Sequence, residues 1–171
     1  MRRTLAHGFT FIELLVTLAV LALLAVAAVP SLLDLLDRQR LRGAAENLRS
    51  DLLLARAEAL RLNAAVSVSI RTDTATGAWC YALSNAGPCD CRSGGCALAG
   101  APAHGTDSAH FRRVTLATNL RQATATFQPA RGTVNAGTVT VRAGAQAVDI
   151  VLSTLGRVRL CSDDLGTYPP C

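Results

Sequence analysis

A long apolar segment near the amino terminus constrains this chain more than any other feature of its sequence. Between residues 9 and 29 every side chain is apolar except three, namely Thr10, Glu13 and Thr17. As an α-helix, this segment would be about 31 Å long, which is enough to cross the hydrocarbon core of a bilayer. Arg2 and Arg3 precede it, and the positive-inside rule therefore places the amino terminus in the cytoplasm. We expect a single-pass transmembrane helix in the inner membrane, with the rest of the chain in the periplasm.

The same segment also has features of a secretory signal peptide. A basic start, an apolar core and the small residues Ala25-Val26-Ala27 are typical of one. Two features favour a permanent anchor instead. Glu13 would cost about 2.5–3.5 kcal/mol near the centre of a bilayer, and a discarded signal has no use for it. Apolar residues also continue at helical spacing after Pro30, at Leu41, Ala45, Leu48, Leu52, Ala55, Ala59 and Leu62.

We therefore expect residues 30–63 to continue the helix as an amphipathic segment. Pro30 is predicted to kink it, because proline removes a helical hydrogen bond and clashes with the preceding turn. A carboxylate inside a membrane segment indicates a functional site with a partner. The natural partner of Glu13 is a free α-amino group on an adjacent subunit. In the alternative interpretation, Glu13 lies near the membrane edge and stays solvated or protonated.

The residues around this carboxylate carry a family resemblance. The run Gly8-Phe9-Thr10-Phe11-Ile12-Glu13-Leu14-Leu15 resembles the cleavage site of type IV prepilins. The resemblance implies that residues 1–8 are a leader, which a prepilin peptidase removes by cutting after Gly8. It further implies that the same peptidase methylates Phe9, and that Glu13 neutralises the amino terminus of a neighbouring subunit during filament assembly.

After residue 63 the hydrophobic pattern changes from helical to alternating. Val66, Val68 and Ile70 alternate with polar residues, which is typical of a β-strand. We predict an α+β fold, in which the long helix packs on an antiparallel β-sheet or β-sandwich head formed by residues 64–171. Similar alternation predicts further strands near residues 78–83, 113–117, 123–128, 138–142, 147–153 and 157–161. Residues 84–110 are rich in Gly, Ala, Ser, Pro and Cys, and are predicted to be an irregular loop tied by disulfides.

All the cysteines of the chain lie in this head, at Cys80, Cys89, Cys91, Cys96, Cys161 and Cys171. An even number of cysteines, confined to the exported side of a membrane segment, predicts disulfides. A zinc site is less well supported, because the cysteines do not form two C-x-x-C pairs. The sequence does not fix the pairing. A bond between Cys161 and Cys171 is one hypothesis, and it would close the tail of residues 161–171 into a loop.

No arrangement of residues in the sequence predicts catalysis. The common nucleophile, zinc-protease and phosphate-binding motifs are absent from it. His104 and His110 both fall in the predicted loop, where we expect them to be solvated and not to bind a metal. We therefore expect no enzymatic activity, no metal and no cofactor. Residues 64–171 contain nine arginines and six aspartates, a mildly basic balance that allows an anionic partner without requiring one.

A second resemblance covers the carboxyl-terminal half of the head. Residues 127–160, which include Leu155-Gly156-Arg157-Val158-Arg159, are similar to the GspH/FimT branch of pilin-like proteins. In this branch, minor pilins that bind DNA during natural transformation carry a Gly-Arg-x-Arg stretch here. The resemblance implies that Arg157 and Arg159, which share one face of a strand, bind DNA. In the alternative interpretation, they are solvated arginines paired with Asp163 and Asp164.

Two functions are consistent with these resemblances. One is a minor pilin of a type IV pilus that captures DNA for uptake. The other is the H-type pseudopilin of a type II secretion system, a structural subunit of the filament that exports proteins. Both imply the same main partners, which are the prepilin peptidase, other pilin or pseudopilin subunits and the inner membrane. The prepilin-like start does not distinguish the two functions.

Overall fold

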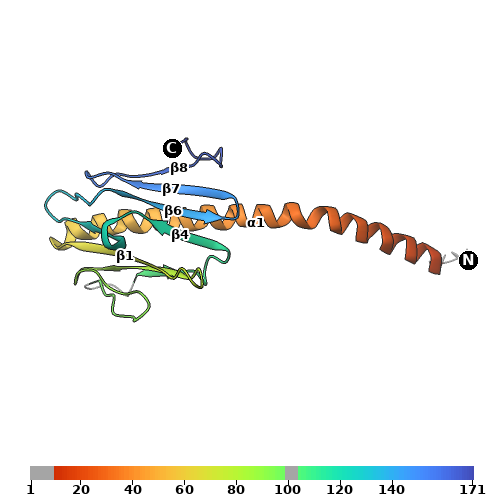
Figure 1. Ribbon diagram of the computed structural model, residues 1–171, viewed down its shortest axis with the longest axis horizontal. Helices are drawn as coiled ribbons and strands as arrows, with labels where there is room; N and C mark the ends of the chain where they lie inside the picture. The colour runs from red at the N-terminus through yellow and green to blue at the C-terminus, as the bar shows by residue number, and fades with distance from the viewer. Residues whose placement is uncertain (1–9, 99–103) are drawn as a thin grey trace, which may run out of the picture. The chain divides into compact units, whose positions relative to one another are not determined.

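The computed structural model describes residues 10–98 and 104–171 of the chain. Within these residues, helix α1 (Phe11–Leu62) is followed by eight β-strands and one short 3-10 helix, η1 (Arg121–Ala123). The chain forms two compact units, residues 1–36 and residues 37–171, so that α1 contributes to both. Each unit is described by itself, and Figure 1 labels α1, β1, β4, β6, β7 and β8.

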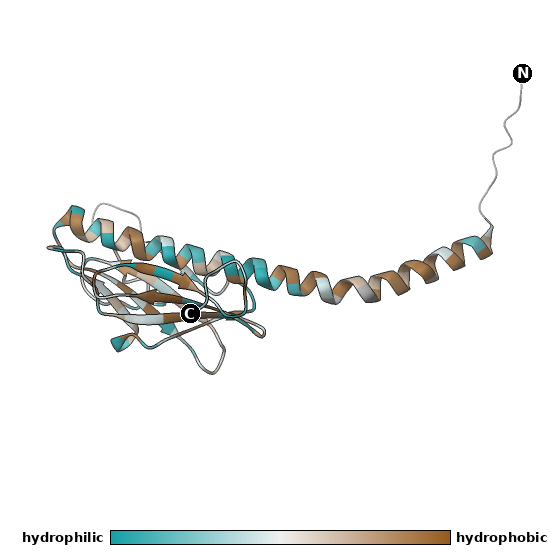
Figure 2. Ribbon diagram, turned by 90° about the horizontal axis from the view of Figure 1, so that it is seen from above, coloured by the Kyte–Doolittle hydropathy of each residue, from teal (hydrophilic) through white to brown (hydrophobic). Residues whose placement is uncertain are grey.

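The first unit contains the apolar part of α1. Thr10 caps the helix, since its hydroxyl oxygen accepts a hydrogen bond of 3.3 Å from the backbone N–H of Glu13. The side chains whose burial is described between residues 11 and 36 are all exposed. The most apolar stretch of the helix has a mean hydropathy of 2.7, and its brown colour is clear in Figure 2. By length and composition α1 can cross a membrane, and it continues through Pro30 without a break.

The second unit combines the rest of α1 with two antiparallel sheets of four strands each. The first sheet has the strand order β3-β2-β1-β5, and the second has the order β4-β6-β7-β8. The strands of the first sheet are β1 (Val66–Thr72), β2 (Trp79–Ser84), β3 (Gly105–Asp107) and β5 (Thr124–Phe127). The strands of the second sheet are β4 (Val114–Thr118), β6 (Gly137–Ala143), β7 (Gln146–Leu152) and β8 (Val158–Cys161).

One hydrophobic core joins α1 to both sheets. The helix contributes the predicted stripe, of which Leu41, Leu48 and Leu52 are completely buried. From the sheets come the alternate strand residues, among them Val68 of β1 and Ile150 of β7. At about 25 cal/mol per Å² of apolar surface, each fully buried leucine contributes roughly 1.5–3 kcal/mol. The α+β fold expected from the sequence, a long helix packed on antiparallel sheets, is confirmed.

Two details of the head differ from the sequence-based predictions. The segment 84–110 is not wholly irregular, because it contains β3, which pairs with β2 at the edge of the first sheet. In addition, Ser67 and Ser69 of β1 are buried, although polar residues that alternate with apolar ones usually face solvent. Ser69 is covered by the cysteine-rich segment, and the hydroxyl of Ser67 forms a hydrogen bond of 3.0 Å with that of Thr126 in the neighbouring strand.

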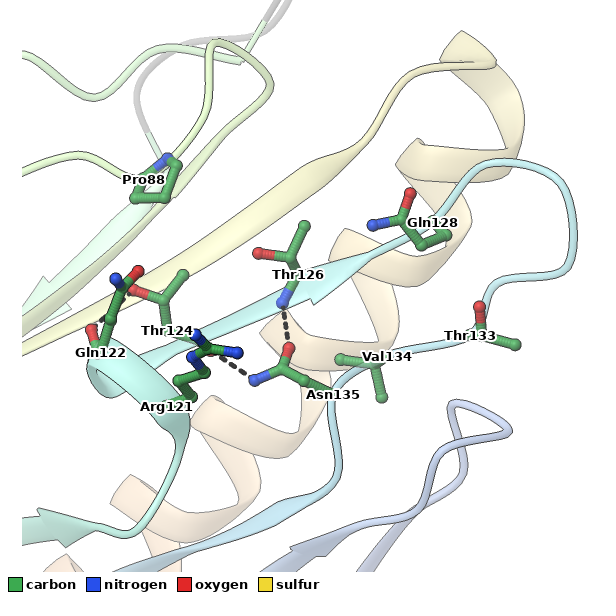
Figure 3. Close-up of a pocket in the computed structure, with 9 residues that line it drawn as sticks. All are labelled: Pro88, Arg121, Gln122, Thr124, Thr126, Gln128, Thr133, Val134 and Asn135. Carbon is green, nitrogen blue, oxygen red and sulfur yellow. Dashed lines mark hydrogen bonds between the residues drawn. The ribbon is translucent and has the colours of Figure 1, made fainter.

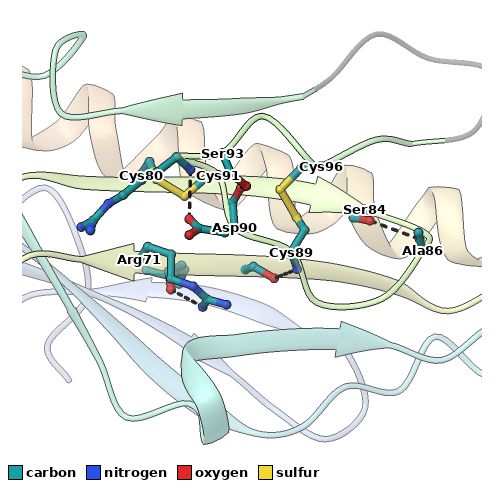
Figure 4. The surroundings of a disulfide bond; sticks show 12 residues. Arg71, Cys80, Ser84, Ala86, Cys89, Asp90, Cys91, Ser93 and Cys96 are labelled. Carbon is teal, nitrogen blue, oxygen red and sulfur yellow. Dashed lines mark hydrogen bonds between the residues drawn. A yellow bond between two sulfur atoms is a disulfide. The ribbon is translucent and has the colours of Figure 1, made fainter.

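All six cysteines form disulfides, so the expectation of disulfides is confirmed. Figure 4 shows two of these bonds, on the face of the first sheet away from α1: Cys80–Cys91 ties the cysteine-rich segment to β2, and Cys89–Cys96 closes a loop within that segment. The backbone N–H of Cys89 donates a hydrogen bond of 3.0 Å to the hydroxyl of Ser69, which gives that buried group a partner. The three bonds are Cys80–Cys91, Cys89–Cys96 and Cys161–Cys171.

Candidate functional site

Arg159 lies in β8, which is an edge strand of the second sheet, and Arg157 directly precedes that strand. Alternation along the strand buries Val158 and Leu160 in the core and leaves both arginines exposed. The two guanidinium groups therefore lie on the same face of the sheet, the outer face, which points away from the core.

The glycine that precedes this pair has a structural role. Gly156 has a φ of +73°, a left-handed conformation that most other residues adopt only with strain. A Cβ atom at this position would lie 2.1 Å from the carbonyl oxygen of Gly132 and 3.1 Å from Nε of Arg56. Nη1 of Arg56 also donates a hydrogen bond of 3.3 Å to the carbonyl of Gly156. The turn before β8 is thus packed directly on α1. This packing fixes the position of the backbone from which the Arg157 side chain extends.

The acidic residues that follow β8 do not neutralise the two arginines. In the described part of the chain, neither Arg157 nor Arg159 forms an ion pair. Asp163 and Asp164 instead accept hydrogen bonds from backbone N–H groups, at 3.1 and 2.9 Å. The pairing considered from the sequence is therefore not found, and both guanidinium groups are available to an anionic partner.

The carboxyl-terminal tail packs on the helix. The bond between Cys161 and Cys171 closes residues 161–171 into a loop. Thr167 accepts a hydrogen bond from the guanidinium of Arg42, and the hydroxyl of Tyr168 donates to Glu46 at 3.3 Å. The ring of Tyr168 is half-buried against the core, so it is held by the helix and is not part of the exposed arginine surface.

The residues of the prepilin-like start fall partly within the structure. Gly8 and Phe9, the predicted cleavage and methylation positions, lie outside the described residues. Glu13 lies in the first turn of α1, where its side chain is exposed. A carboxylate near the positive end of the helix dipole is favourably placed.

The two histidines of the head have carboxylate partners. Nε2 of His104 lies 2.7 Å from Asp51 of α1, and the other oxygen of Asp51 accepts a hydrogen bond of 2.7 Å from Tyr81. Burial, and then the bond to Asp51, raise the pKa of Tyr81 far above its usual range. His110 lies 3.0 Å from Asp107. The two contacts of Asp51 join α1 to β2 and to the residue before β3. No group of three metal-binding side chains occurs in the ranges 10–98 and 104–171.

A polar groove runs along the edge of the first sheet, beside β5 (Figure 3). The side-chain amide of Asn135 bonds to β5 as a neighbouring strand would, since it accepts from the N–H of Thr126 and donates to the carbonyl of Thr124, both at 2.8 Å. The free edge of the sheet is therefore partly protected. The groove is lined by Pro88, Arg121, Gln122, Thr124, Thr126, Gln128, Thr133, Val134 and Asn135.

A comparison with models of protein families identifies the family of this chain. The family model described as "Type II transport protein GspH" matches residues 44–156, which span most of the second unit. The chain belongs to the GspH family. A second model, the "Prokaryotic N-terminal methylation motif", matches residues 3–29 of this GspH-family chain. The resemblances to prepilins and to the GspH/FimT branch are thus confirmed, and both the family and the fold are those of pilin-like filament subunits.

One solved structure supports the same assignment. A crystal structure of the type IV minor pilin FimU of Pseudomonas aeruginosa PAO1 in space group P21 is 25% identical, with a TM-score of 0.51. That match covers 72% of this GspH-family chain and 89% of FimU. The same protein in space group P65 is 22% identical, with a TM-score of 0.48 and coverage of 70% and 90%. No curated protein sequence matches the chain.

Proposed function

We propose that this protein is a non-enzymatic minor pilin that binds DNA for uptake through Arg157 and Arg159. The observation that carries the proposal is the exposure of both guanidinium groups on one face of an edge strand, without an acidic partner among the described residues. Guanidinium groups engage phosphate oxygens through two parallel hydrogen bonds. Arginines spaced along a strand face are therefore suited to contact the phosphates of a nucleic acid backbone.

Such contacts carry no information about base sequence, and binding should be largely independent of it. Two phosphate contacts give weak affinity, so we expect a dissociation constant in the micromolar range or higher. Several subunits in one filament would raise the effective affinity through avidity. The half-buried Tyr168 is not expected to stack on bases, because its ring packs on the core and its hydroxyl bonds to Glu46.

The amino-terminal segment provides the proposed route into the filament. The prepilin peptidase cuts after Gly8 and methylates Phe9, and α1 anchors the protein in the inner membrane with its head in the periplasm. Glu13 then neutralises the new amino terminus of a neighbouring subunit during assembly. The match to the methylation motif over residues 3–29 and the exposed apolar surface of α1 support this sequence of events.

A second candidate function has its own support. The description of the matching family model favours the H-type pseudopilin of a type II secretion system, whereas the likeness to FimU favours a pilus subunit. In a secretion pseudopilin the arginines would have no DNA to bind. The two functions therefore differ in a property that can be measured on the purified protein.

The test is binding of the full chain, in a non-ionic detergent, to a short fluorescent DNA duplex over a range of salt concentrations. Replacing Arg157 and Arg159 with Ala should lower the slope of log K against log salt by about two. The control is the double replacement Arg112→Ala with Arg142→Ala, two exposed arginines elsewhere on the head. Equal losses in both variants would indicate a diffuse basic surface. No binding by the unaltered protein at low salt would favour the secretion pseudopilin.

A further inference from the structure

Two turns that are distant in sequence meet beside the arginine pair. The ends of the turn of residues 128–133 are joined by a hydrogen bond of 2.8 Å from the N–H of Gln128 to the carbonyl of Thr133. A second bond of 2.9 Å, from the N–H of Gly132 to the carbonyl of Gln128, lies within the turn. Its backbone approaches the turn before β8 so closely that a side chain at Gly156 would collide with the carbonyl oxygen of Gly132. The contact is therefore between the two backbones themselves, with no side chain between them.

This contact brings a third arginine to the same place. Arg131 directly precedes Gly132, and Arg157 directly follows Gly156. Like Arg157, Arg131 is exposed and forms no ion pair within the described residues. Arg131 and Arg157 are therefore each adjacent in sequence to one of the two glycines at which the turns touch.

A fourth guanidinium group lies beneath the two turns. The side chain of Arg56 contacts the positions of both Gly132 and Gly156. Its Nε is buried without a hydrogen-bond partner, and it has no acidic partner in the part of the chain that the structure describes. A partly buried, unpaired cation is costly to the fold, and it raises the positive potential where the two turns meet.

Acidic groups on the outer face of the second sheet lie towards its other end. Asp149 is opposite Cys161, at the far end of β8 from Arg157, and it accepts a hydrogen bond of 2.6 Å from Thr140. Asp163 and Asp164 follow Cys161 in the chain. Exposed Arg142 of β6 lines the same pocket as these three aspartates, so the acidic end of the face also carries an arginine. Arg157, which precedes β8, lies at the opposite end of that strand from the aspartates.

We propose that Arg131 is a third phosphate contact, so that the binding surface extends from β8 across both turns. This inference rests on the proposed DNA-binding function and specifies it further. Arg131, Arg157 and Arg159 come from two turns and a strand. Because each side chain starts from a different backbone position, successive phosphates of a nucleic acid backbone can each meet one of the three.

The experiment measures fluorescence anisotropy of a short DNA duplex with the full chain in non-ionic detergent, at several salt concentrations. Arg131→Ala should lower the slope of log K against log salt by about one, and should weaken binding roughly 5–10-fold near 0.1 M salt. Arg131→Lys keeps the positive charge, and it should retain most of the slope. The matched control is Arg112→Ala, which removes an exposed arginine from a different turn.

The outcomes separate this inference from the proposed function. If Arg131→Ala behaves like Arg112→Ala while the Arg157 and Arg159 double variant still loses two units of slope, the third contact is wrong and DNA binding stands. If Arg131→Lys loses as much as Arg131→Ala, the residue does not act through its charge, and the inference is also wrong. If the unaltered protein does not bind the duplex at low salt, both proposals fail.

Discussion

Arg56 of α1 donates a hydrogen bond to the backbone carbonyl of Gly156, with 3.3 Å between Nη1 and the oxygen. This bond joins the helix to the turn that precedes the arginine pair of β8. The same guanidinium packs against Gly132, so one side chain of the helix supports both turns of the proposed binding surface. The position of the surface therefore depends on the packing of α1 as well as on the second sheet.

The first prediction concerns Gly156. Gly156→Ala should destabilise the head for two reasons, a left-handed backbone that costs about 1–2 kcal/mol and a Cβ atom that would lie 2.1 Å from the carbonyl of Gly132. Gly144→Ala is the matched control, because Gly144 has a similar φ of +58° but open space around its Cβ position. Urea unfolding should show the larger loss for Gly156→Ala. Equal losses would mean that the contact between the turns is unimportant to stability.

The second prediction concerns the buried hydrogen bond between Tyr81 and Asp51. Tyr81→Phe removes a donor from a buried carboxylate and should lower the free energy of unfolding by about 1–3 kcal/mol. Tyr168→Phe is the control, since it removes a longer and more exposed bond to Glu46 and should cost less than about 0.5 kcal/mol. Thermal or urea unfolding of both variants measures the difference. A loss for Tyr81→Phe no greater than the control would contradict the role assigned to this bond.

The third prediction concerns Glu13. Glu13→Ala should leave the protein inserted in the membrane and processed, because removing a charge from an apolar helix favours insertion. It should nevertheless reduce assembly, because the neighbouring amino terminus would lose its counter-charge in lipid. The measurement is the amount of the protein in filaments sheared from cells, relative to the amount in membranes. Normal incorporation of the variant would show that the carboxylate has no role in assembly.

Much of the fold could be predicted from periodicity. Leu41, Leu48 and Leu52 repeat at helical spacing, and the structure buries all three. Val66, Val68 and Ile70 alternate, and they form the inner face of β1. These elements were accessible because their burial depends on a single repeating pattern, which local sequence records directly.

Other features depend on contacts between distant segments, and the sequence does not record those. Strand β3 was missed because Gly105, Thr106 and Asp107 contain no apolar alternation, and the strand exists through its pairing with β2. Ser69 is buried because a disulfide-tied segment covers it. Arg131 was not selected as a site residue, because its proximity to Arg157 arises only where two turns meet in the folded chain.

The most direct test of the central claim, that this chain is processed and assembled as a prepilin, is the mass of its mature amino-terminal peptide. The protein should be extracted from membranes of cells that contain a prepilin peptidase, digested and analysed by mass spectrometry. We predict that the peptide begins at Phe9 and carries one methyl group on its α-nitrogen. A mature terminus at Ala28 would instead establish a discarded secretory signal, and it would contradict the account.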